Sequence, residues 1–165
     1  QDLKRSIDKN ELDEKIRQAR ALSFVDGSCY WYGYLIMDNY GGVANTLVTQ
    51  THRAKSLIPA YTHMHKGQPD KVKKLVNVFT EDMHFLTWES NKLSPSPESA
   101  NYFVVYRFRK GEKVNINNAT NIVKITGDNF YVIPYENGKT EYTYVVTAVD
   151  SFHNESKPTQ LKVKN

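Results

Sequence analysis

Four side chains near residue 34 are the first candidates for contact with a ligand: Tyr30, Trp31, Tyr32 and Asp38. Aromatic rings offer flat apolar surfaces on which sugars and partner proteins stack, although filling a core is the commoner role of any single ring. Asp38 could transfer a proton, but Asp38-Asn39 is also a favourable turn sequence. No Ser-His-Asp set, Cys-His pair, phosphate loop or pair of carboxylates accompanies these residues, so the sequence predicts no catalytic residue.

The histidines and the single cysteine give little support for a metal centre. His63-Met64-His65 would place two imidazoles on one side of an extended segment, but no cysteine or carboxylate stands at a supporting spacing. We therefore expect no metal and no cofactor, and we interpret residues 62–69 as a connector between domains. Cys29 lies in an apolar and aromatic run, which predicts a buried, unreactive thiol.

Composition indicates a globular chain without membrane spans. Of its 165 residues, 39% are hydrophobic and 24% charged, and no apolar run approaches the roughly 18 residues of a membrane helix. The net charge is +4, but acidic residues are interspersed among the basic ones and no nucleic-acid motif is present. A solvated basic face is the better interpretation, and we expect neither a nucleic-acid partner nor a membrane-spanning segment.

The C-terminal part is organised around residues 142–150. In an extended strand, Tyr142, Tyr144, Val146 and Ala148 would share one face while threonines occupy the other. About seven such short strands follow one another from residue 75, separated by turn sequences, as in an immunoglobulin-like antiparallel β-sandwich. The residues expected to form its structural core are Leu86, Trp88, Val104, Tyr106, Tyr142, Tyr144 and Val146.

The N-terminal third has a different pattern. Leu12, Ile16 and Ala19 recur at helical spacing after Asn10, a suitable helix N-cap. Residues 28–32 can run as a buried strand, and a second helix is expected to begin near residues 40–42. The order helix, strand, helix is one turn of an α/β unit, and a single strand needs a partner from elsewhere.

This N-terminal pattern resembles the last turn of the (β/α)8 barrel of glycoside-hydrolase-like family 10 proteins, which are common in gut Bacteroidetes. The resemblance rests on residues 12–16, residues 27–32 and a final helix closing at Leu57-Ile58-Pro59. It implies that Tyr30, Trp31, Tyr32 and Asp38 line a sugar cleft at the end of the last strand. It also implies that most of the barrel, with its catalytic carboxylates, lies outside this chain.

The C-terminal strands resemble fibronectin type III domains. The resemblance rests on Leu86-x-Trp88, on Tyr102-x-Val104-x-Tyr106 and on the alternating residues of 142–148. It implies that Trp88 packs between the sheets. It also implies that Tyr142 forms a tyrosine corner, with its hydroxyl bonded back to the main chain.

Together these patterns predict an α+β chain of two parts. A helix/strand/helix barrel remnant over residues 1–66 is followed by a linker at 67–74 and by a fibronectin type III-like sandwich at 75–165. We expect the C-terminal part of a glycosyl hydrolase, inactive alone, with the sandwich as an accessory module. The alternative is a non-catalytic module that binds carbohydrate or protein. The resemblance implies a polysaccharide or oligosaccharide partner through the parent protein and a periplasmic or cell-surface location. Apolar surface on the N-terminal segment would favour a homodimer.

Overall fold

A computed structural model of the chain describes residues 9–25, 27–30, 33–81, 83–90, 99–136 and 141–164. The chain divides into two compact units, Gln1–Ala54 and Lys55–Asn165. This boundary precedes the linker expected at residues 67–74.

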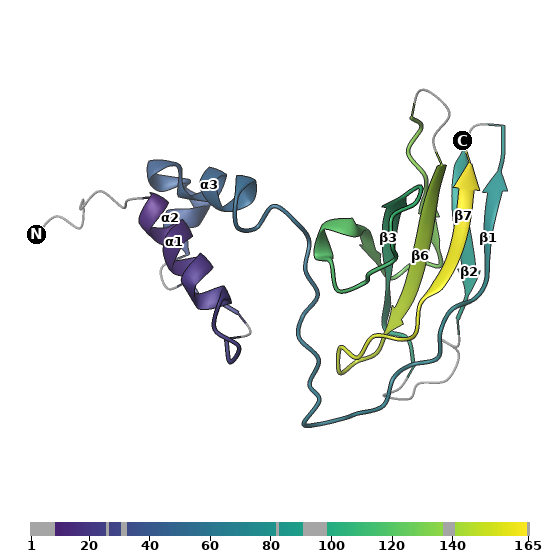
Figure 1. The fold of residues 1–165 in the computed structure, drawn as a ribbon, viewed down its shortest axis with the longest axis horizontal. Coiled ribbons are helices and arrows are strands. Elements are labelled where there is room, and N and C mark those ends of the chain that lie inside the picture. The colour runs from purple at the N-terminus through teal and green to yellow at the C-terminus, as the bar shows by residue number, and fades with distance from the viewer. Residues whose placement is uncertain are drawn as a thin grey trace, which may run out of the picture. The chain divides into compact units, whose positions relative to one another are not determined.

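The first unit is helical in its described residues (Figure 1). Its elements are α1 (Lys9–Arg20), α2 (Tyr34–Met37), a 3-10 turn (Tyr40–Gly42) and α3 (Val43–Thr49). The apolar stripe of α1 buries Ile16 against Val43 and Leu47 of α3, as the helical spacing predicts. Around this cluster pack the half-buried side chains of Leu12, Tyr30 and Ile36.

The strand expected at residues 28–32 is absent from the part of this segment that the structure describes. Residues 28–30 have no regular structure, and Trp31 and Tyr32 lie outside the described residues. A strand needs a neighbouring edge for its backbone hydrogen bonds, and the described part of this unit supplies none. Cys29 is exposed, so the expectation of a buried thiol was wrong.

The second predicted helix begins close to its expected position but ends early. Gly42 has a φ of +80°, which suits glycine and lets the chain enter α3 at Val43. The helix ends at Thr49, whereas the barrel resemblance implied a final helix closing at Leu57-Ile58-Pro59. Residues 55–60 have no regular structure.

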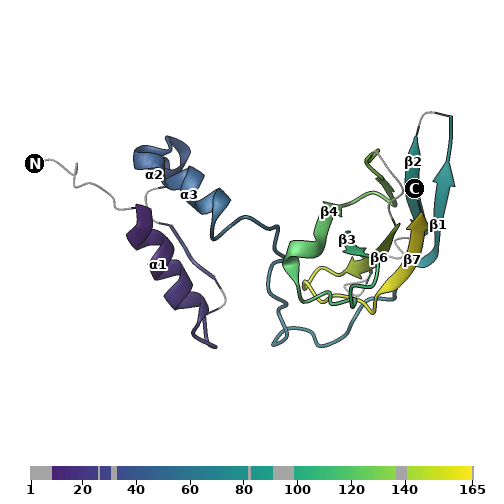
Figure 2. The same cartoon turned by 45° about the horizontal axis from the view of Figure 1, so that its top comes forward.

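The second unit consists of two antiparallel sheets, compatible with an immunoglobulin-like or fibronectin type III sandwich. The three-stranded sheet has the order β1-β2-β5 and the four-stranded sheet the order β4-β3-β6-β7. Figures 1 and 2 show β1 beside β2 and β3 beside β6. The strands are β1 (Lys73–Phe79), β2 (His84–Glu89), β3 (Tyr102–Arg109), β4 (Ile122–Thr126), β5 (Phe130–Val132), β6 (Glu141–Val149) and β7 (Thr159–Lys164).

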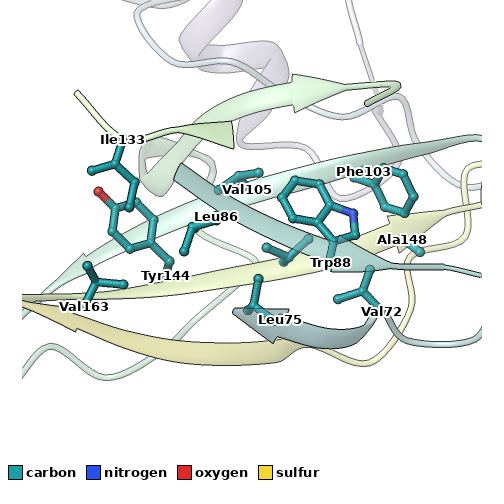
Figure 3. Packing of buried hydrophobic residues seen from close by; sticks show 11 residues of the cluster. Val72, Leu75, Leu86, Trp88, Phe103, Val105, Ile133, Tyr144, Ala148 and Val163 are labelled. Carbon is teal, nitrogen blue, oxygen red and sulfur yellow. The ribbon is translucent and has the colours of Figure 1, made fainter. Parts of the chain in front are cut away.

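The inner faces of both sheets form one apolar core (Figure 3). Trp88 of β2 is 2% exposed, and its ring meets Phe103 of β3 edge-on, with centroids 5.5 Å apart. Tyr144 of β6 is buried in the same layer. The buried members of this core are Val72, Leu75, Leu86, Trp88, Phe103, Val105, Ile133, Tyr144, Val146, Ala148 and Val163.

The outer face of the four-stranded sheet is buried as well. Val104 and Tyr106 lie here rather than between the sheets, and both are 0% exposed. The half-buried side chains that cover this face include Leu57 and Val114. The central strands β3 and β6 are therefore covered on both sides, and their side chains are mostly apolar, which explains their nearly continuous burial.

Residues 55–72 belong to the sandwich although they form no helix or strand. The Lys55 ammonium donates to the Val123 carbonyl at 2.7 Å, and the Tyr61 amide donates to the Phe152 carbonyl at 2.8 Å. At the other end, Val72 is 1% exposed within the inter-sheet core. We call residues 55–72 the strap, because they run along the outside of the sandwich before β1 begins.

Tyr142 lies near the start of β6. Among the described residues its hydroxyl bonds to a side chain, whereas the hydroxyl of a tyrosine corner bonds to the main chain. Its hydroxyl donates to the Glu136 carboxylate at 2.7 Å, and the Arg107 guanidinium lies 4.6 Å from its ring centre. Arg107 also pairs with Glu136 at 2.5 Å. A carboxylate accepts more strongly than a carbonyl, which gives a physical reason for the change of partner. Both hydrogen bonds stabilise the charged carboxylate and so lower the pKa of Glu136, and the bond from Tyr142 has the larger effect.

Replacing Trp88 by alanine tests the inter-sheet core. Removing this buried ring should lower the free energy of unfolding by about 3–5 kcal/mol, measured by chemical denaturation. Tyr135→Ala is the matched control, because that ring is 90% exposed and its loss should change little. Equal effects of the two substitutions would contradict the core assignment.

Candidate functional site

Of the four predicted ligand-contacting residues, the structure describes Tyr30 and Asp38. The Tyr30 ring packs against the small core of the first unit, and its hydroxyl lies 3.3 Å from Nε2 of His52. Burial raises the pKa of Tyr30 and, together with the nearby Arg20 charge, lowers that of His52. Both side chains are therefore held neutral at pH 7, which suits a hydrogen bond between them.

Asp38 occupies a different environment. It is exposed at the C-terminal end of α2, where its backbone amide donates to the Tyr34 carbonyl at 2.8 Å. This is the turn role that the sequence offered as the alternative to acid or base chemistry. Tyr30 is thus committed to packing and Asp38 to ending a helix.

The two histidines of the strap contact different aromatic rings. His63 lies beside Tyr61, with ring centroids 6.2 Å apart, whereas His65 lies beside Phe152 at 5.2 Å. Across the part of the chain that the structure describes, no three side chains among His, Cys, Asp and Glu come together to hold a metal ion.

The structure instead gathers rings where the strap meets the β6–β7 loop. His153 has Nδ1 3.3 Å from the Tyr102 hydroxyl, and its ring meets the Tyr61 ring edge-on at 5.1 Å. Tyr61 is 42% exposed, while Tyr102 and His153 are half-buried. We call Tyr61, His63, Tyr102 and His153 the ring cluster. It brings together the strap, β3 and the loop.

A buried carboxylate shapes the loop that carries His153. Asp150 is 0% exposed and accepts from the backbone amides of Phe152 and Asn154 at 2.9 and 2.8 Å. It also accepts from the Asn154 side chain at 3.0 Å. The loop can therefore hold His153 at a φ of +63°, which a non-glycine residue seldom adopts.

Glu155 fixes the same loop to the outer face of the sheet. One of its oxygens accepts from the hydroxyls of Tyr106 and Thr147, both at 2.6 Å. Burial raises the pKa of Tyr106, and the bond to Glu155 raises it further, so the phenol stays a donor. The pKa of Tyr102 is also raised, first by burial and then by the negative charges of Glu155 and Asp150.

Chemically, the ring cluster can stack on a ligand and hydrogen-bond to it, but the two nearby carboxylates, Asp150 and Glu155, are already engaged in hydrogen bonds. Asp150 has no solvent exposure, and Glu155 already holds two hydroxyls. Sequence reasoning missed this cluster because its members are distant along the chain. The sequence did offer one indication of an ordered loop here. Asp150 and Asn154 follow directly after the clearly alternating residues 142–148, and side chains of these types often bond loop amides.

Comparison with known proteins gives no family. No family model matches the sequence, and no curated protein matches it. Among the described residues, no helix is long and apolar enough to cross a membrane.

Solved structures with which the chain shares a weak likeness include glycan-related enzymes and fibronectin type III domains. One is the spore cortex lytic enzyme SleM of Clostridium perfringens, at 18% identity, covering 59% of this chain and 28% of that chain, with a TM-score of 0.42. The glycoside hydrolase domain of Endo-D from Streptococcus pneumoniae matches at 12% identity, covering 58% and 15%, with a TM-score of 0.39.

A fibronectin type-III domain of human fibronectin type III domain containing protein 3 matches at 17% identity, covering 59% of this chain and 87% of that one, with a TM-score of 0.40. The chain spans 28% of the length of SleM. These TM-scores are too low to support a fold assignment. The assignment therefore rests on the strand order and register of this chain itself.

Replacing Thr147 by valine tests the anchoring of the loop. The change keeps the shape of a side chain that is 0% exposed but removes one of the two hydroxyls on Glu155. It should lower the free energy of unfolding by about 1–3 kcal/mol in chemical denaturation, as expected for a bond to a charged group.

Thr143→Val is the control, since Thr143 lies on the same face of β6 and its hydroxyl makes no hydrogen bond within the described residues. If both variants unfold at the same denaturant concentration as the wild type, Glu155 does not anchor the loop.

Proposed function

We propose that this chain is the C-terminal part of a glycoside-hydrolase-like protein, with the sandwich as its structural accessory module. The observation that carries the proposal is the contrast between the two units. The second unit has an inter-sheet core and a covered outer face, as a self-sufficient domain should. In the described part of the first unit, the buried hydrophobic cluster contains only Ile16, Val43 and Leu47.

The described part of the first unit also exposes several large hydrophobic side chains. Met37 is 86% exposed and Phe24 78%, and both are large side chains. The other large hydrophobic side chains that it exposes are Leu22, Tyr34, Tyr40 and Val48. A segment of about 50 residues with so small a core is marginal by itself, and such surfaces usually pack against another part of a protein. The rest of a (β/α)8 barrel, of which this unit would be the last turn, is a partner of the right kind.

The proposal assigns no catalysis to this chain alone. A glycosidase needs two carboxylates on either side of the bond, and barrel enzymes collect them from several strand ends. In the first unit Asp38 is the carboxylate that the barrel resemblance places near the strand end, and it lies exposed at the end of α2. The glycan, its linkage, and a periplasmic or cell-surface location belong to the parent protein in this proposal.

An activity assay tests the assignment. The purified chain should release no product from a panel of polysaccharides and aryl glycosides, as measured by reducing ends and by chromophore release. In the parent protein, Asp38→Asn should abolish activity only if Asp38 is one of the catalytic carboxylates. Turnover by the isolated chain would overturn the proposal. A structure of the parent with residues 27–32 outside any sheet would overturn the barrel assignment.

A second candidate function is that of a non-catalytic carbohydrate-binding module, and the ring cluster favours it. Tyr61 presents an exposed ring beside the imidazoles of His63 and His153, and His153 in turn lies beside the Tyr102 hydroxyl. The cluster therefore provides both stacking and hydrogen-bonding groups.

Affinity electrophoresis in gels that contain soluble polysaccharides tests this function. If it is correct, one of the glycans should retard the wild type, and Tyr61→Ala should migrate freely. Tyr135→Ala removes a ring that is more exposed than Tyr61 and lies outside the ring cluster, so this variant should keep the retardation. An unretarded wild type across the panel would exclude this candidate.

A further inference from the structure

Three exposed lysines lie on two of the segments that carry the ring cluster. Lys66 and Lys71 belong to the strap, and Lys157 belongs to the segment between β6 and β7. We call these three residues the basic margin. The net charge of +4 belongs to the second unit as a whole, because basic and acidic residues balance at seven each in residues 1–54.

Hydrogen bonds hold the two segments of the basic margin side by side. The Asn154 side chain donates to the His65 carbonyl at 3.4 Å. Farther along both segments, the Thr159 hydroxyl donates to the Val72 carbonyl at 2.8 Å. The strap residues between these two bonds therefore run beside the residues that lead into β7. The three lysines thus lie on adjacent stretches of backbone.

Packing fixes the backbone around Lys66. The His65 imidazole lies against the Phe152 ring, with centroids 5.2 Å apart. The same imidazole fills the space that a side chain at position 67 would need, which explains the glycine found there. Lys66 is therefore an exposed side chain on a strap segment that is held against the loop of the ring cluster.

The carboxylates of this region do not neutralise the basic margin. Asp150 is 0% exposed, and Glu155 already accepts from two hydroxyls. Asp70 is the one acidic residue of the strap, against three lysines. Among the described residues, no ion pair joins a lysine of the basic margin to a carboxylate. The surface beside the ring cluster is therefore positively charged.

We propose that the ring cluster and the basic margin together bind an acidic glycan, one that carries carboxylate or sulfate groups. This inference rests on the second candidate function above and names its class of ligand. The exposed Tyr61 ring offers a stacking surface to the apolar face of a sugar, while His153 and Tyr102 offer hydrogen-bonding groups to its hydroxyls. The lysines pair with the negatively charged groups of the neighbouring sugars.

Other classes of ligand match this surface less completely. A neutral glycan would stack on the ring but gain nothing from the ammonium groups. A protein that binds nucleic acid commonly neutralises about six to ten phosphates. The basic margin offers three ammonium groups beside one well-exposed ring, which suits a short stretch of charged sugars better.

Isothermal titration calorimetry at constant salt tests the proposal with two matched pairs of polymers. Galacturonan is compared with its methyl ester, and dextran sulfate with dextran, so that each pair differs in charge on the same sugar backbone. The wild type should bind the charged member of at least one pair roughly tenfold more tightly than the neutral member, as expected for two or three exposed ion pairs. The pair that shows the difference identifies the charged group.

Lysine variants test the role of the basic margin. Lys66→Gln and Lys157→Gln should each weaken binding of the charged polymer about two- to fivefold, the effect of one exposed ion pair. Lys164→Gln is the matched control and should bind like the wild type, because this exposed lysine lies at the far end of β7 from Lys157. Tyr61→Ala should abolish binding of charged and neutral polymers alike.

The results that would overturn this inference also identify what has failed. Equal affinity for both members of each pair would remove the preference for acidic glycans but leave the carbohydrate-binding function standing. Charged-polymer binding that survives Tyr61→Ala, or equal affinity for single-stranded DNA, would show attraction by charge alone. A wild type that binds neither charged polymer would also overturn the inference, and the gel assay above would then decide the carbohydrate-binding function by itself.

Discussion

The two-sided burial of β3 and β6 is the constraint on which the second unit depends. Phe103 and Val105 face the opposite sheet, while Val104 and Tyr106 face outward and are equally inaccessible. An outer sheet face of this composition would expose a large apolar surface if nothing covered it. The strap and the segment before β4 supply the cover, with Leu57, Val114 and Ile116 in contact with the face. The strap is therefore part of the domain.

The same constraint explains the polar groups near the β6–β7 loop. Thr147 is a polar residue on a fully buried face, and its hydroxyl needs an acceptor. Glu155 provides the acceptor for Thr147 and for Tyr106. Asp150 meanwhile bonds the loop amides, and the loop bonds the strap through the Phe152 carbonyl. The ring cluster is positioned by this chain of hydrogen bonds.

The sequence predicted the strands well because each has a strong local signal. Alternation in residues 142–148 predicted β6, and the turn sequences between apolar runs predicted about seven short strands from residue 75, where the described residues form β1 to β7. The sequence could not assign Val104 and Tyr106 to the outer layer, because alternation identifies two faces without saying what covers each one. It also placed a linker at 67–74, whereas Val72 is fully buried. Residues 55–72 lack periodicity, and their role depends on contacts with residues far along the chain.

In the first unit, local patterns were a poorer guide. The stripe of α1 and the start of α3 were predicted from spacing and from the glycines near residue 42. The strand expected at residues 28–32 is absent from its described part, residues 28–30, since a strand is stabilised by a neighbour rather than by its own sequence. Of the predicted ligand-contacting residues, Tyr30 packs inward and Asp38 ends a helix. The ring cluster arises only from the tertiary fold.

Native-state hydrogen exchange of the chain, followed by mass spectrometry, tests the central contrast between the two units. If the sandwich is a complete domain, the amides of β3 and β6 and the Tyr61 amide of the strap should be strongly protected. Their hydrogen bonds should break only when the whole unit unfolds. The amides of α1 and α3 should exchange much faster, because the core that holds these helices is small. Equal protection of the helices and of β6 would contradict the account, since the first unit would then be a complete domain.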